Sequence, residues 1–198
     1  MIRTYFNQKA DVWDETCSEQ DAAKLEQIAN RLGIEPGDNV LDVGSGTGVF
    51  IPLLLSRIGK EGRLVALDFA EEMLKKAQAK GFNGDIQYLH ADVTNMPLLE
   101  KVFDVVVCYS SFPHFQDKLR ALVEINRVTK SGGRLVICHT SSRAQINQIH
   151  HEIPAVENDI IPDKNEMQIV LSMAGFTDIM IDDGCESYLA SARKLKQA

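Results

Sequence analysis

Apolar and polar positions along the chain repeat as a short apolar run, a turn, and then a segment with helical spacing. In the helical segments, apolar residues recur every three or four positions. The short runs are apolar on both sides, which is typical of strands in a parallel sheet that helices cover on both faces. The predicted strands are residues 39–43, 63–67, 86–90, 103–108 and 134–139, and the helices between them are residues 49–58, 71–80 and 118–128.

The C-terminal third follows a different order. Residues 164–174 have helical spacing, and residues 176–182 and 186–193 read as two strands separated by Asp-Gly-Cys. That short connection favours an antiparallel hairpin. The whole pattern predicts an α/β fold with a three-layer, Rossmann-like sheet of about seven strands, mostly parallel, with an antiparallel C-terminal edge strand and helices on both faces.

Length and charge narrow the class of protein. A chain of 198 residues fits one domain, residues 1–198. The formal net charge of −7 and the lack of a basic block argue against a nucleic-acid partner. The four cysteines are widely spaced, which favours reduced thiols and a cytoplasmic location. We also expect no signal peptide and no membrane span, because no apolar stretch is long enough.

A glycine-rich turn is the most specific local motif in the sequence. Residues 40–48 read Val-Leu-Asp-Val-Gly-Ser-Gly-Thr-Gly, with glycine at alternate positions 44, 46 and 48 between a strand and a helix. Glycine allows a tight turn and a close approach to a ligand, and the helix amino end attracts a polar or anionic group. The dinucleotide fingerprint G-x-G-x-x-G differs, because here the third glycine comes one residue early.

Three carboxylates accompany this turn at the ends of successive strands. Asp42 precedes the first glycine by two residues, and Asp68 ends the next strand. A carboxylate at Asp68 can accept hydrogen bonds from both ribose hydroxyls, which NAD and S-adenosyl-L-methionine (SAM) share. Asp92 follows the third strand, where a carboxylate can accept from an adenine amino group. The set predicts an adenosine-containing cofactor.

With these motifs the sequence resembles the class I SAM-dependent methyltransferases, most closely the methyltransferase-11 and ubiquinone/menaquinone-biosynthesis type. Five segments match the family motifs in order, and residues 6–14 are similar to a segment that folds over the cofactor in relatives. The resemblance implies that residues 1–35 form a helical cover over the cofactor. The matching segments are residues 40–48, 64–74, 91–93, 103–107 and 127–135.

The resemblance also implies roles for single residues around SAM, whose product is S-adenosyl-L-homocysteine (SAH). The assignments are Gly44, Ser45, Gly46 and Gly48 to the methionine part, Asp42 to its amino group, Asp68 to the ribose, Phe69, Met73, Asp92 and Val93 to the adenine, and Tyr109 to the vicinity of the sulfonium.

Four histidines are expected near the same edge of the sheet. His114 and His139 follow the fourth and fifth strands, and His150 and His151 lie in a polar segment, residues 140–163, that we expect to form the substrate wall. His114 first and His139 second are candidates for a general base, with Tyr109 as a positioning group. All four histidines are also weak candidates for a divalent metal site, or they are ordinary polar lining.

The predicted function is in-line methyl transfer from SAM to a small-molecule acceptor, by a monomer or a homodimer. Two alternatives stay open from the sequence. One is a SAM- or metal-binding module without catalysis, and the other is an NAD-dependent oxidoreductase, which the early third glycine disfavours.

Overall fold

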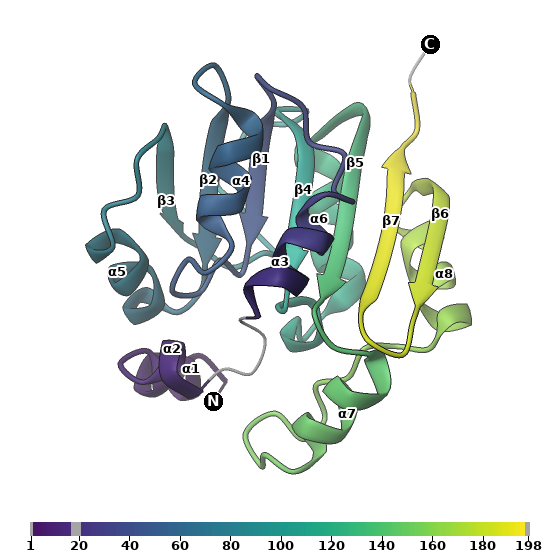
Figure 1. Ribbon diagram of the computed structural model, residues 1–198. Helices are drawn as coiled ribbons and strands as arrows, with labels where there is room; N and C mark the ends of the chain where they lie inside the picture. The colour runs from purple at the N-terminus through teal and green to yellow at the C-terminus, as the bar shows by residue number, and fades with distance from the viewer. Residues whose placement is uncertain (1, 17–20, 197–198) are drawn as a thin grey trace.

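The computed structural model describes residues 2–16 and 21–196 and contains one seven-stranded sheet with the order β3-β2-β1-β4-β5-β7-β6 (Figure 1). Strands β1 to β5 pair in parallel, and β7 pairs antiparallel with both β5 and β6. The strands are β1 (Asn39–Val43), β2 (Arg63–Asp68), β3 (Ile86–His90), β4 (Phe103–Tyr109), β5 (Thr129–His139), β6 (Phe176–Asp183) and β7 (Tyr188–Lys194).

Helices pack on both faces of this sheet. The residues of β1 divide between two apolar clusters: Val40 packs in the cluster that holds α3 and α4, whereas Leu41 and Val43 pack in the cluster that holds α6 and α8. This alternation follows from the two-residue period of a strand. The helices are α1 (Ile2–Lys9), α2 (Trp13–Thr16), α3 (Ala22–Ala29), α4 (Ile51–Ile58), α5 (Glu71–Ala79), α6 (Lys118–Val128), α7 (Arg143–His151) and α8 (Lys164–Met173), with a short 3₁₀ helix, η1, at Phe112–His114.

The predicted fold class is confirmed. The two C-terminal strands form the expected hairpin, and the antiparallel strand is β7, which lies between β5 and the edge strand β6. Several boundaries differ from the prediction by one to five residues, and two of these differences have a structural reason. Strand β5 begins at Thr129 rather than at residue 134, because Thr129 already pairs with Phe103. Helix α4 begins two residues late, because Val49 still belongs to the glycine turn.

The strand directions determine where a ligand can bind. The carboxyl ends of β1 to β5 point to one edge of the sheet, and helices α1, α2 and α7 lie at that edge (Figure 1). In open α/β sheets, ligands bind outside the carboxyl ends of the strands. None of the helices in residues 2–16 and 21–196 has the length and apolarity needed to cross a membrane. Cys108, Cys138 and Cys185 are free thiols, and Cys17 lies outside the described residues.

Candidate active site

The glycine turn after β1 has the backbone that its sequence predicts. Gly44, Gly46 and Gly48 all have positive φ angles, of 74°, 55° and 84°. A Cβ atom on Gly44 would stand 2.4 Å from Cβ of Ser111, so a larger residue does not fit there. Nothing lies within 4 Å of a Cβ placed on Gly46, which therefore faces open space. The turn brings bare backbone to the wall of a cavity.

Asp42 lies buried behind this turn. Its side chain is 1% exposed, and neither carboxylate oxygen has a hydrogen-bond partner among the described residues. Burial, reinforced by the charge of nearby Asp68, raises the pKa of Asp42 to about 7. An unpaired buried carboxylate is costly, and a cation or an ordered water supplies what it lacks. Ser45 Oγ is buried and unpaired in the same part of the described structure.

Asp68 joins the end of β2 to the glycine turn. Its Oδ2 accepts from the Gly46 amide at 2.8 Å, and its Oδ1 accepts from the Ala70 amide at 2.8 Å. Burial raises the pKa of Asp68 to about 6, although both hydrogen bonds act in the opposite direction. Each oxygen keeps a second lone pair for another donor. Asp68 is therefore both a support of the turn and an acceptor on the wall of the cavity.

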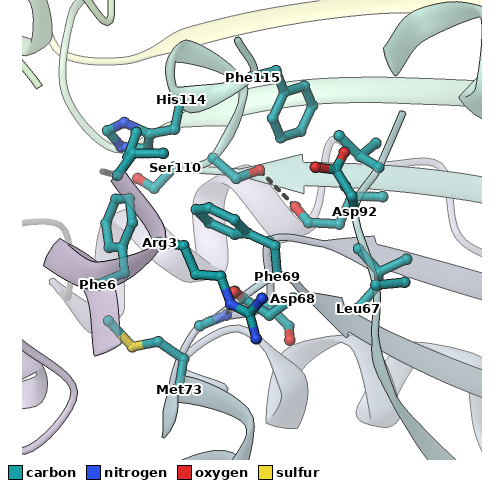
Figure 2. A pocket seen from close by; sticks show the side chains of 18 of the residues that line it. Arg3, Phe6, Leu67, Asp68, Phe69, Met73, Asp92, Ser110, His114 and Phe115 are labelled. Carbon is teal, nitrogen blue, oxygen red and sulfur yellow. Dashed lines mark hydrogen bonds between the residues drawn. The ribbon is translucent and has the colours of Figure 1, made fainter. Parts of the chain in front are cut away.

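A cavity of about 330 Å³ opens at this edge of the sheet. Its volume is at the lower end of the range for small-molecule sites, and aromatic side chains contribute much of its wall. Figure 2 shows Asp68 and Asp92 at the strand ends, with Phe6, Phe69 and Met73 on the side of α1 and α5. The predicted cofactor residues that line it are Gly44, Ser45, Gly46, Asp68, Phe69, Met73, Asp92, Val93 and Tyr109.

Two of the predicted residues do not line this cavity. Asp42 lies behind the turn. Gly48 ends the turn and packs where a Cβ atom would stand 2.8 Å from the ring of Phe82. Asp92 is exposed, and its Oδ1 accepts from both the amide and the hydroxyl of Thr94. Tyr109 stacks on Phe50 with ring centroids 4.5 Å apart, and its hydroxyl lies 3.2 Å from Thr140 Oγ1.

The N-terminal segment lies against the cavity and is held by polar contacts. Asn7 accepts from the Glu72 amide at 3.1 Å, and Lys76 pairs with Asp11 at 2.6 Å. Asp14 accepts from the Thr47 hydroxyl and pairs with Lys80. These contacts fix α1 and α2 to α5 and to the glycine turn. Phe6 and Trp13 thereby reach the cavity wall, where their rings are 5.5 Å apart.

The four predicted histidines have different surroundings in the structure. His114 lines the cavity, and its Nδ1 lies 2.9 Å from Oδ2 of Asp159. The ring of His150 lies 4.8 Å from that of His114. His139 is 1% exposed and lies under Ser110 rather than on the cavity wall, with 3.5 Å between His139 Nδ1 and Ser110 Oγ. His151 is exposed.

No metal centre emerges from this arrangement. Within residues 2–16 and 21–196, no group of three or more histidine, cysteine, aspartate or glutamate side chains is placed to hold a metal ion.

The sequence interpretation missed Asp159, the partner of His114. Only the order of charges in the polar segment between residues 140 and 163 could have drawn attention to it, and that order does not single out one acid.

The donor set of this edge fits a SAM molecule. The orphaned carboxylate of Asp42 lies behind the turn, where a bridging water would connect it to an ammonium group. The lone pairs of Asp68 suit ribose hydroxyls, and Phe69 and Met73 offer an apolar surface to an adenine ring. When bound, SAM supplies a methyl group that is activated by a sulfonium.

Comparison with known proteins agrees with this geometry. Residues 41–137 match a family described as a methyltransferase domain. A ubiquinone/menaquinone biosynthesis C-methyltransferase of Teredinibacter turnerae is 38% identical over 113 residues, which are 55% of this chain and 45% of that protein. Residues 41–137 are thus similar to the methyltransferase domains, and these matches support the predicted class I SAM-dependent methyltransferase family. The chain spans about half the length of the first curated relatives that it matches.

Solved structures show the same fold. A SAM-dependent methyltransferase from Aquifex aeolicus has a TM-score of 0.75 at 22% identity, and the match covers 96% of this chain and 98% of that one. Phosphoethanolamine N-methyltransferase 2 of Haemonchus contortus, in complex with SAM, has a TM-score of 0.78 at 14% identity, covering 99% and 60%. The predicted fold is thus confirmed, and the family match agrees with the predicted methyltransferase family.

Proposed function

We propose that this chain binds SAM at the carboxyl edge of its sheet and transfers the methyl group to a small-molecule acceptor. One observation carries the proposal: the glycine turn and the Asp68 carboxylate, which supports it through the Gly46 amide, line the same cavity. A plain strand-to-helix turn needs neither the open space at Gly46 nor the unpaired carboxylate of Asp42 behind it.

The cofactor residues have distinct roles in this proposal. The turn holds the methionine part of SAM, and Asp42 orients its amino group through water. Asp68 accepts from the ribose hydroxyls. On either side of the adenine lie the side chains of Phe69 and Met73, with Asp92 and Val93 at its edge. Helices α1 and α2 cover the cofactor, and Phe6 and Trp13 exclude water from it.

The residues of the chain then have to place a nucleophile in line with the methyl group. His114 is the first candidate for the base that removes a proton from the acceptor, because it lines the cavity. His139 is the weaker candidate, since it is buried outside the cavity wall. Tyr109 lines the cavity from the end of β4 and is a positioning group near the reacting atoms.

A compact acceptor built on an aromatic or quinone-type ring fits the site best. Aromatic rings prefer apolar, ring-lined walls, and Phe6, Trp13 and Phe115 supply them. The relative from Teredinibacter turnerae is named for ubiquinone and menaquinone biosynthesis, which points to the same class of acceptor. A cytoplasmic location, a monomeric or homodimeric state and the absence of a nucleic-acid partner are predictions from the sequence.

The proposal predicts transfer of a labelled methyl group from SAM to a ring acceptor, with SAH released in equal amount. The test is incubation of the protein with methyl-labelled SAM and a panel of reduced naphthoquinones, catechols and aromatic amines. We expect product with a member of the ring classes and none in a reaction without protein. Binding of SAM without transfer to any member would contradict the proposal and favour a SAM-binding module.

A further inference from the structure

A carboxylate from the segment after α7 contacts the histidine on the cavity wall. Asp159 lies 45 positions after His114 in the sequence, yet its Oδ2 is 2.9 Å from His114 Nδ1. Both side chains are largely buried, with exposed fractions of 13% for His114 and 11% for Asp159. The second oxygen of Asp159 accepts from Gln116 Nε2 at 3.3 Å. Solvent therefore does little to weaken the contact.

The backbone around Asp159 is held on both sides. Asn147 of α7 donates to the Ile161 carbonyl at 3.0 Å and accepts from the Ile161 amide at 2.8 Å. Val156 and Ile161 are buried. The carbonyl of Asp159 accepts from His150 Nδ1 at 2.5 Å. These contacts place the carboxylate at His114 without help from a ligand.

The partners decide which ring nitrogen of His114 carries the proton. An ionised carboxylate can only accept, so Nδ1 of His114 is the donor in this contact. In a neutral imidazole the other nitrogen, Nε2, is then unprotonated and basic. Nε2 has no hydrogen-bond partner within the described residues, and His114 lines the cavity where an acceptor binds. The geometry leaves the basic nitrogen available.

The surroundings favour the neutral form of this histidine. Burial lowers the pKa of His114, and the positive forms of His150 from α7 and His139 from β5 add to that effect, whereas Asp159 opposes it. From α1, the ring of Phe6 packs edge-on at 4.9 Å. From α6, Lys118 donates to the carbonyls of Pro113 and Phe115 instead of to the imidazole.

We propose that Asp159 is a positioning residue that holds His114 as the general base for an acceptor that loses a proton during methylation. This inference rests on the proposed function. In the step, the proton of the acceptor moves to His114 Nε2, and the electron pair it leaves forms the new bond to the methyl carbon. The pair of the broken carbon–sulfur bond stays on sulfur. The imidazolium is stabilised by Asp159 and returns its proton to water.

A general base at His114 narrows the class of acceptor to molecules that lose a proton during methylation. A base is needed for a hydroxyl, or for a ring carbon of a quinol, whose hydroxyl ionises as the carbon is methylated and whose ring hydrogen then leaves as a proton while the oxygen is reprotonated. It is not needed for a tertiary amine or a thioether, which have no proton to lose. A reduced quinone or a phenol therefore fits both the aromatic walls and the pair of His114 and Asp159.

The test replaces Asp159 with asparagine and uses Glu157→Gln, an exposed carboxylate of the same segment, as the control. Asparagine can donate as well as accept, so it no longer selects one tautomer of His114. Nitrogen-15 NMR of the ligand-free protein should show the Nδ1–H tautomer in wild type and a mixture in Asp159→Asn. We expect turnover to fall by about 10-fold or more, with unchanged SAM affinity. The part of the pH–rate profile in which the rate rises with pH should move to lower pH, because Asp159 no longer raises the pKa of His114.

A second variant, Asp159→Ala, leaves His114 Nδ1 without its partner and should reproduce the tautomer change. The control Glu157→Gln should behave as wild type. A wild-type tautomer and pH limb in both Asp159 variants would overturn the inference, even if the variants are less stable. If wild-type protein methylates no member of the panel, the proposed function fails, whereas the NMR measurement still reports on whether Asp159 positions His114.

Discussion

Replacing Asp68 with asparagine is expected to weaken SAM and SAH binding by about 100-fold or more, which equals a loss of about 2.7 kcal/mol. Both oxygens of Asp68 accept from backbone amides, those of Gly46 and Ala70. An asparagine NH₂ group would therefore face one of these donors, and the turn would lose its support. The ribose would lose a charged acceptor as well. Isothermal titration with SAH measures the effect.

The pH dependence of binding follows from the same carboxylate and from Asp42, which we assign to the amino group of SAM and whose pKa is raised by burial to about 7. Burial raises the pKa of Asp68 from 3.8 to about 6, so its ionised form is lost as the pH falls through 6. Affinity for SAH should therefore be highest above pH 7 and decline below pH 6 in wild type. Asp104→Asn is the matched control, because Asp104 pairs with Lys130 at the opposite edge of the sheet. Wild-type affinity in Asp68→Asn would refute the ribose assignment.

Replacing His114 with alanine is expected to lower turnover by about 100-fold or more while leaving SAM affinity unchanged. The imidazole lines the cavity from η1, and His114 is not among the residues assigned to SAM, so its loss removes the base without removing a proposed cofactor contact. Single-turnover transfer of a labelled methyl group separates the chemical step from binding. The reaction is run on the acceptor identified by the panel.

The control for this substitution is His151→Ala, which changes an exposed histidine at the end of α7. Its turnover should equal that of wild type. Unchanged turnover in His114→Ala would show that the acceptor needs no base at this position, and it would remove the role we assign to His114. A parallel fall in SAM affinity would instead show that His114 supports the cofactor.

The sequence predicts most of the fold because local patterns determine it. The apolar run of β4 and the helical spacing of α6 are each visible without knowledge of the rest of the chain. Asp68 and Asp92 are equally accessible to prediction, since the carboxyl ends of neighbouring parallel strands meet at one edge. The glycine turn lies there for the same reason.

Other parts of the site depend on contacts that no local pattern encodes. Asp159 reaches His114 from an irregular segment, which is shaped in part by the hydrogen bonds between Asn147 and the backbone of Ile161. The burial of His139, which separates it from the cavity, follows from the antiparallel pairing of its strand with Tyr188 of β7. His114 and His139, which follow neighbouring strands, thus have different surroundings in the fold. Their spacing in the sequence does not reveal this difference.

We propose that the carboxyl edge of this sheet is a SAM site. Isothermal titration of the ligand-free protein with SAM, SAH and NAD⁺, under identical conditions at pH 7.5, tests it most directly. We expect one saturable site per chain for SAM and SAH and no binding of NAD⁺ at the same concentrations. Heat from NAD⁺ with none from SAM or SAH would contradict it.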